Sequence, residues 1–100
     1  MAYAVSYEVP GNEEIYGKVK AEIGNDRPQG LIVHLVVQRE AGLQHIEVWE
    51  SEESWVRFRD EEAQPAVNRF LKSFGFDDPA PAPAEEEIQV VDVMLGQAKT

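Results

Sequence analysis

The chain lacks cysteine, so its 100 residues hold no disulfide, no thiolate nucleophile and no thiolate metal ligand. Basic residues are few: 9 Lys and Arg stand against 19 Asp and Glu, and the formal net charge is −10. This charge argues against nucleic acids and anionic membrane surfaces as partners, because both attract basic patches. No apolar run approaches the ~20 residues of a membrane span, and the N-terminus lacks the basic and apolar segments of a signal peptide. We therefore expect a cytoplasmic protein.

The common sequence signatures of catalysis are also missing. The chain has no Gly-rich phosphate loop, no nucleophile elbow and no Ser-His-Asp order. Its two histidines, His34 and His45, are separated by a distance in sequence that fits no common metal-ligand motif. The sequence therefore predicts no metal site and no cofactor.

What the sequence does contain is a regular succession of strand and helix patterns. Asn12 and Ser51 are suited to cap two amphipathic helices, which Gly24 and Gly75 would end. Pro65 is expected to break or kink the second helix after Ala63. Period-two alternation marks the strands. The expected elements are, in order, a strand over 3–9, a helix over 13–23, strands over 31–38 and 43–50, a helix over 52–74 and a strand over 88–95.

This order, β-α-β-β-α-β, predicts an α+β ferredoxin-like fold. Such a fold is a four-stranded antiparallel sheet with both helices on one face, and right-handed crossovers place the first and third strands in its centre. We expect a single domain over 1–100, with a core at about 3–95, a proline-rich connector at 77–84 and a frayed tail at 96–100.

Two helices can cover only one face of that sheet. The strand over 31–38 carries Leu35 and Val37 on one face and Ile32 and Val36 on the other, so the uncovered face is apolar too. An exposed apolar patch of several hundred Å² is at the upper limit for a monomer. We therefore expect a homodimer in which two sheets pack face to face.

Several segments together resemble a known family. They are Pro10-Gly11, residues 28–34 (Pro-Gln-Gly-Leu-Ile-Val-His), residues 48–51 (Val-Trp-Glu-Ser), Phe58 with Pro65, and the proline-rich approach to the last strand. The pattern resembles the dimeric α+β barrel superfamily, in particular small antibiotic-biosynthesis-monooxygenase-like domains that carry no assigned activity. The resemblance implies two sheets that close into a barrel across a dimer, with a cavity between sheet and helices in each protomer.

Relatives in that superfamily oxidise polycyclic phenols without a cofactor, degrade haem, isomerise lactones or bind small molecules. The haem-degrading members place a histidine on a helix beside an asparagine and a tryptophan. Both histidines of this chain are expected on strands, so the resemblance does not extend to haem chemistry.

His34 is the candidate catalytic residue. A neutral imidazole in the middle of a strand can act as a general base or hold a phenol or carbonyl group. The competing interpretation is a partly buried histidine that is satisfied by a neighbouring polar group.

Further candidates for ligand binding lie on the third strand, where His45, Glu47 and Trp49 share one face by period two. One hairpin register pairs Val36 with Glu47 and brings His34 opposite Trp49. A register shifted by one residue turns His34 to the other face, and the sequence leaves this choice open.

Two other residues, Tyr7 and Asp92, complete the candidate ligand site, and Tyr16 could act in the same way as Tyr7. Tyr7 and Tyr16 could offer phenol groups to a ligand carbonyl, although a place in the core or an interface is the commoner role for each. Asp92 is expected inside the last strand, where it would need a partner such as Arg57, Arg59 or His34.

Two functions from different classes fit these patterns. The first is a cofactor-independent, monooxygenase-like enzyme or binding protein for an apolar or aromatic small molecule, with His34 as polar anchor or base and Trp49 and Tyr7 as cavity walls. The second is a non-catalytic dimeric structural or interaction module whose cavity is filled by its own side chains.

Overall fold

The computed structural model describes residues 2–96, which fold in the expected order of strands and helices. The frayed tail expected at 96–100 lies, apart from Gly96, outside the described residues. The elements are β1 (Tyr3–Val9), α1 (Glu13–Ile23), β2 (Leu31–Arg39), β3 (Gly42–Trp49), α2 (Glu52–Phe58), η1 (Arg59–Ala63), α3 (Gln64–Lys72) and β4 (Glu85–Ile88).

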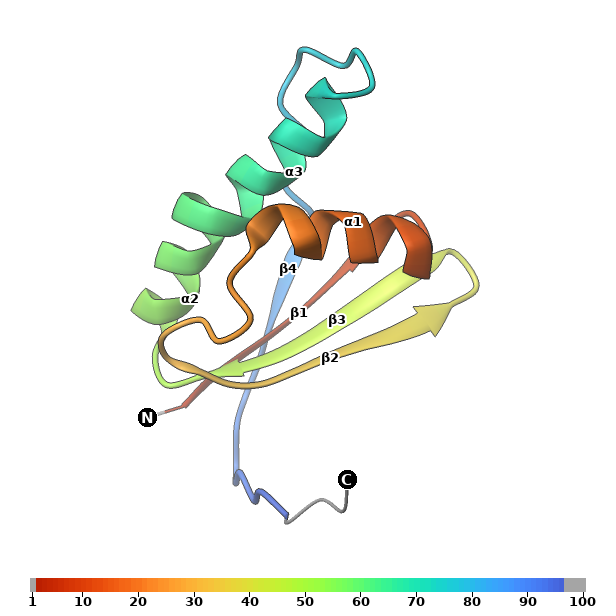
Figure 1. Cartoon of the computed structure of the whole chain (residues 1–100). Coiled ribbons are helices and arrows are strands. Elements are labelled where there is room, and N and C mark those ends of the chain that lie inside the picture. The colour runs from red at the N-terminus through yellow and green to blue at the C-terminus, as the bar shows by residue number, and fades with distance from the viewer. Residues whose placement is uncertain (1, 97–100) are drawn as a thin grey trace.

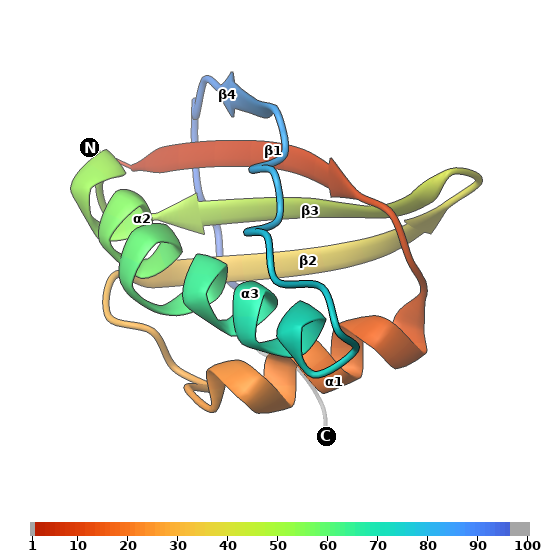
Figure 2. The same cartoon turned by 90° about the horizontal axis from the view of Figure 1, so that it is seen from above.

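The sheet is antiparallel with the strand order β2-β3-β1-β4, so β1 and β3 are central as expected. All helices lie on one face of it (Figure 1), and the strand order can be followed from above in Figure 2. The ferredoxin-like fold class is therefore confirmed. None of the helices in the described part of the chain is both long enough and apolar enough to cross a membrane.

The register of the β2–β3 hairpin decides which side chains face the helices. Val36 pairs with His45 and His34 pairs with Glu47, so His34 lies on the face of His45 and Glu47. The pairing shifts between Leu31 and Val33, a bulge at which one extra residue turns Leu31 toward Trp49. His34 therefore stands opposite Glu47 and not opposite Trp49.

The core between sheet and helices is built around two tryptophans. Val5, Trp49 and Trp55 are buried, and the rings of Trp49 and Trp55 lie 5.7 Å apart. Phe58 adds a second ring at 5.3 Å from Trp49. This aromatic layer fixes β3 against α2 and so holds the helix-facing side of the sheet in place.

The sequence predicted a break or a kink in the second helical segment after Ala63; the segment is continuous but contains a π turn that ends at Ala63. Ser51 caps it by accepting a hydrogen bond from the Ser54 N–H at 3.2 Å. Before Pro65 the helix widens into the π turn η1, in which the Gln64 N–H donates to the Arg59 carbonyl five residues back. Proline lacks an N–H and its ring clashes with the carbonyl four residues earlier. A π turn just ahead of it relieves this conflict without breaking the helix.

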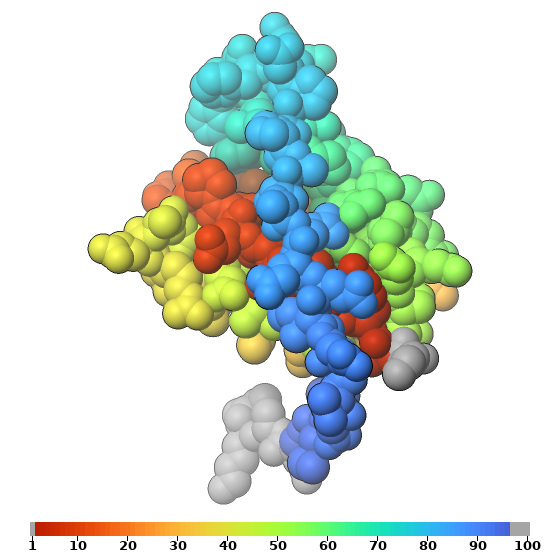
Figure 3. All heavy atoms as spheres, turned by 180° about the vertical axis from the view of Figure 1, so that it is seen from behind, coloured from red at the N-terminus to blue at the C-terminus, as the bar shows by residue number. Residues whose placement is uncertain are grey.

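The last strand differs most from the expectation. β4 covers Glu85–Ile88, whereas the expected strand over 88–95 forms no sheet pairing beyond Ile88. The physical reason is the length of its partner: Ala4 pairs with Ile88, and β1 begins one residue earlier, at Tyr3. After the connector and β4, visible from behind in Figure 3, the chain leaves the sheet on the side away from the helices (Figure 1).

Candidate functional site

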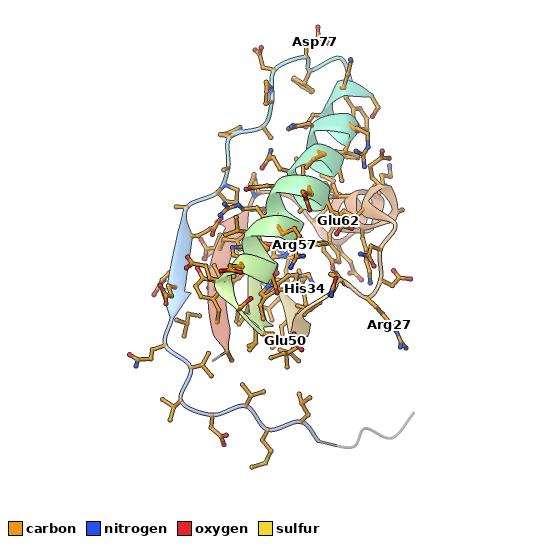
Figure 4. The ribbon with its side chains drawn as sticks, turned by 90° about the vertical axis from the view of Figure 1, so that its left-hand side faces the viewer. Arg27, His34, Glu50, Arg57, Glu62 and Asp77 are labelled. Carbon is orange, nitrogen blue, oxygen red and sulfur yellow. The ribbon has the colours of Figure 1, made fainter. Side chains whose placement is uncertain are left out.

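Five side chains from three neighbouring strands meet on the helix-facing side of the sheet. They form what we call the polar cluster: Tyr7 of β1, His34 of β2, and His45, Glu47 and Trp49 of β3. The cluster contains five of the six predicted site residues. In Figure 4 His34 lies near the centre of the molecule, whereas Arg27 and Asp77 lie at its periphery.

Glu47 is the centre of the polar cluster. Its side chain is 2% exposed, yet both of its oxygens have donors. The Tyr7 hydroxyl donates to Glu47 Oε2 at 2.5 Å, and the Trp49 indole donates to Oε1 at 2.9 Å. A buried carboxylate requires such donors because it has lost its hydration. Tyr7 and Trp49 therefore hold Glu47 in one orientation.

The two histidines are in direct contact. His34 Nε2 lies 3.0 Å from His45 Nδ1, and the rings stack with centroids 5.2 Å apart. Burial lowers the pKa of His45 to about 4, and the neighbouring His34 adds to this shift. Burial also lowers the pKa of His34, with Lys20 in the same direction and Glu47 opposing it. Both rings are therefore neutral at neutral pH, and one donates its proton to the other.

The tyrosines of the site act as donors and packing groups. Burial raises the pKa of Tyr7, and the Glu47 carboxylate raises it further. Tyr7 also stacks on His45 with ring centroids 4.7 Å apart. Tyr16 of α1 meets His45 edge-on at 5.6 Å, and burial together with Glu47 raises its pKa. The polar cluster thus lies between the sheet and α1, with both phenols protonated.

Asp92 is the one predicted site residue that lies elsewhere. It follows the end of β4 and is exposed, so the expected pairing inside a strand is wrong. Arg59, one of its expected partners, instead binds Glu85 at 2.9 Å. Glu85 also accepts from the Trp55 indole at 2.9 Å, a contact that joins β4 to α2. Sequence reasoning missed this role because Glu85 opens a run of three glutamates that is typical of a solvated surface.

Two surface hollows of the described chain lie apart from the polar cluster. Both lie along α2 and η1 and share Arg57 and Glu61. The first is completed by Glu52, Glu53, Val56 and Asp60, and the second by Gln29, Ser54, Phe58 and Glu62. No member of the polar cluster lines either hollow.

Comparison with known proteins identifies the fold class. The chain matches no protein-family profile and no curated protein sequence. Solved structures do match: a Chloroflexus aurantiacus J-10-fl protein provisionally assigned as an antibiotic biosynthesis monooxygenase is 19% identical with a TM-score of 0.62. That match covers 94% of this chain and 97% of the other.

Two further matches have the same fold. Rv0793 from Mycobacterium tuberculosis is 12% identical with a TM-score of 0.56, covering 91% of this chain and 95% of the other. SnoaB from Streptomyces nogalater, described as a cofactor-independent oxygenase, is also 12% identical, with a TM-score of 0.54 and coverages of 92% and 93%. The expected resemblance to antibiotic-biosynthesis-monooxygenase-like domains is therefore confirmed at the level of the fold.

Proposed function

We propose that this chain forms a homodimer that binds an apolar or aromatic small molecule, with the polar cluster as its anchoring group and a monooxygenase-like reaction as the corresponding activity. One observation carries the proposal. Glu47 is buried and held by two donors, while the adjacent His34 side chain is 27% exposed and therefore within reach of a ligand. A fixed carboxylate behind a reachable imidazole is an arrangement suited to proton transfer.

His34 is the group that would meet the ligand. Its Nε2 is 3.5 Å from Glu47 Oε2 and 3.0 Å from His45 Nδ1, whereas its Nδ1 has no hydrogen-bond partner among the described residues. Nδ1 is thus available to a phenol or carbonyl oxygen. If His34 takes a phenol proton, Glu47 stabilises the resulting imidazolium. Trp49 is fully buried, so its part is to hold Glu47, and Tyr7 holds the same carboxylate from β1.

The homodimer is supported by apolar side chains that nothing covers in the described chain. On the face away from the helices Leu35 is 52% exposed, and in the segment after β4 Val91 is 94% and Met94 86% exposed. Covering ~400 Å² of apolar surface contributes about 10 kcal/mol in gross terms. Two such faces offset an association cost of ~4–15 kcal/mol. A cytoplasmic location and a single domain over 1–100 remain expectations from the sequence.

The alternative is a non-catalytic dimeric module, and one observation favours it. The members of the polar cluster bond to one another, and the two hollows along α2 and η1 are lined by other residues. In that case the polar cluster would only specify how the strands and helices pack.

A thermal-shift screen with phenols and quinones, in buffer containing a chelator, separates the two functions. Ligand at 100 times its Kd stabilises a protein by about 2.7 kcal/mol, which is a readily measured rise in Tm. We expect such a rise for the wild type and for Glu50→Ala, a control at an exposed glutamate, and a smaller rise for His34→Ala. Absence of any ligand-induced rise in the wild type would favour the non-catalytic module. Equal rises in the wild type and His34→Ala would show that His34 is not the anchor.

A further inference from the structure

We propose that His34, His45 and Glu47 form a binding site for one divalent transition-metal ion, with Zn²⁺ as the reference ion. The proposal goes beyond the function above, which concerns the metal-free polar cluster. It rests on the positions of three ligand atoms that the fold brings together from two strands.

The spacing of the three ligand atoms fits one ion. His34 Nε2 is 3.0 Å from His45 Nδ1 and 3.5 Å from Glu47 Oε2, and His45 Nδ1 is 3.9 Å from the same oxygen. A circle through three points with these separations has a radius of about 2.0 Å, which matches Zn–N and Zn–O bond lengths. An ion at this position would reach all three atoms with little movement of the side chains.

The chemistry of the donors selects the class of ion. Two imidazoles and one carboxylate suit Zn²⁺, Ni²⁺, Cu²⁺ and Fe²⁺, whereas Mg²⁺ and Ca²⁺ favour sets of oxygen ligands. The arrangement requires the ring protons to lie on His34 Nδ1 and His45 Nε2, a tautomer that each neutral imidazole can adopt. Three protein ligands leave further coordination positions to water or a small molecule.

The surroundings of Glu47 are also those of a metal ligand. The Trp49 indole holds Oε1 at 2.9 Å, which leaves Oε2 turned toward the histidines. Hydrogen bonds of this kind orient ligating carboxylates in metal sites. An ion would enter past His34, whose side chain is 27% exposed, since Glu47 is 2% exposed.

The metal-free arrangement explains how the site can exist without an ion. A hydrogen bond between the two rings occupies the gap, and the Tyr7 hydroxyl satisfies Glu47 Oε2. An ion would replace the ring-to-ring hydrogen bond by two lone-pair contacts. Binding would therefore tie β2 to β3 and raise the stability of the folded chain.

Calorimetric titration with Zn²⁺ tests the proposal on untagged full-length protein that has been freed of metal by a chelator. The wild type and Glu50→Ala should each bind one ion per chain, and Co²⁺ should give the visible absorption of a site with nitrogen and oxygen ligands. His34→Ala and Glu47→Gln should each weaken the affinity at least about tenfold, since each removes one of three ligands. His34→Ala is the main variant because His34 is the most exposed ligand, and circular dichroism checks that it folds.

A second measurement needs no substitution. The chain has only two histidines and no cysteine, so the nitrogen NMR spectrum of the imidazoles has two sets of signals. One equivalent of Zn²⁺ should shift the signals of both, at His34 Nε2 and His45 Nδ1, and Mg²⁺ should shift neither.

Three results would overturn the metal site: no saturable Zn²⁺ binding by the wild type, equal affinity in His34→Ala, or a shift of one imidazole alone. The phenol and quinone screen runs in a chelator. Failure of the metal site therefore leaves that screen unaffected, and failure of ligand binding leaves the titration unaffected.

Discussion

Removing the Glu47 side chain should destabilise the protein strongly, because two buried donors depend on it. In Glu47→Ala the Tyr7 hydroxyl and the Trp49 indole N–H lose their acceptor. Each unsatisfied buried donor costs about 1–3 kcal/mol, so the free energy of unfolding should fall by about 2–6 kcal/mol. The small cavity left behind adds to this loss. A fall of this size is a large fraction of the ~5–15 kcal/mol that stabilises a typical domain.

Urea unfolding, followed by the fluorescence of Trp49 and Trp55 at one fixed protein concentration, measures this loss. Both tryptophans are buried, so their emission reports on the core that contains the polar cluster. Glu47→Gln keeps an acceptor for Trp49 and should cost less, about 1–2 kcal/mol. Glu50→Ala removes an exposed carboxylate next to the same strand and should stay within about 0.5 kcal/mol of the wild type. If Glu47→Ala also stays within that range, the hydrogen bonds to Glu47 do not hold the site together.

Three further perturbations test other parts of the structure. The folded pKa of His45, about 4, lies below its unfolded value of ~6.5, so the unfolded chain takes up a proton at His45 more readily than the folded one. The free energy of unfolding of the metal-free protein should therefore be highest above pH 6.5 and should fall by up to about 3 kcal/mol as the pH drops from 6.5 through 4. Urea midpoints across that range should show an acid-side slope that His45→Gln reduces; equal slopes would contradict the shifted pKa. Gly30→Ala would place a Cβ 2.5 Å from Ser54 Oγ at a φ of +90° and should lower the free energy of unfolding by about 2–4 kcal/mol. Gly17→Ala is the control, because a Cβ there meets nothing within 4 Å and should leave the stability unchanged or raise it. Similar urea midpoints for the two variants would refute the close packing at Gly30. Leu35→Lys should shift a dimer toward monomer in sedimentation experiments, and an unchanged oligomeric state would exclude that sheet face as the interface.

Features of the fold that depend on near neighbours in sequence could be predicted from the sequence. The caps are the clearest case: Asn12 accepts from the Ile15 N–H at 3.0 Å, and Ser51 accepts from the Ser54 N–H at 3.2 Å. A cap is made within one helical turn, so its residue types are visible locally. The order of elements, and through it the sheet topology, follow from the same kind of local pattern.

The end of the sheet could not be predicted in this way. Alternation of apolar residues predicted a strand over 88–95, but a strand also needs a partner, and β1, which pairs with Ile88 through Ala4, begins only one residue earlier, at Tyr3. The start of β4 is instead fixed by Glu85, which binds Arg59 and Trp55 of the helical segment. These contacts join residues 26 and 30 positions apart, and no local pattern in the sequence indicates them.

The part of the candidate site on β3 could be predicted from the sequence, but the place of His34 beside it could not. Period two places His45, Glu47 and Trp49 on one face whatever their neighbours are. The position of His34 depends on the pairing of two strands, in which a slip of one residue would turn it to the opposite face. The observed register, with Val36 opposite His45, brings the two histidines into contact. The metal-ligand set is therefore a product of the hairpin register, and no spacing motif in the sequence reports it.

The exposure of the three groups orders the roles that they can take. Glu47 is 2%, His45 9% and His34 27% exposed at the side chain, and His34 belongs to β2, one of the two edge strands of the sheet. His45 and Glu47 lie on the central strand β3, where Tyr7 stacks on His45 and Trp49 donates a hydrogen bond to Glu47. These contacts hold both side chains in place behind the more exposed His34. Of these three groups, His34 is therefore the one most open to a phenol, a carbonyl or a metal ion. His34→Ala is the one substitution that affects every proposed ligand while leaving the buried carboxylate and its two donors in place.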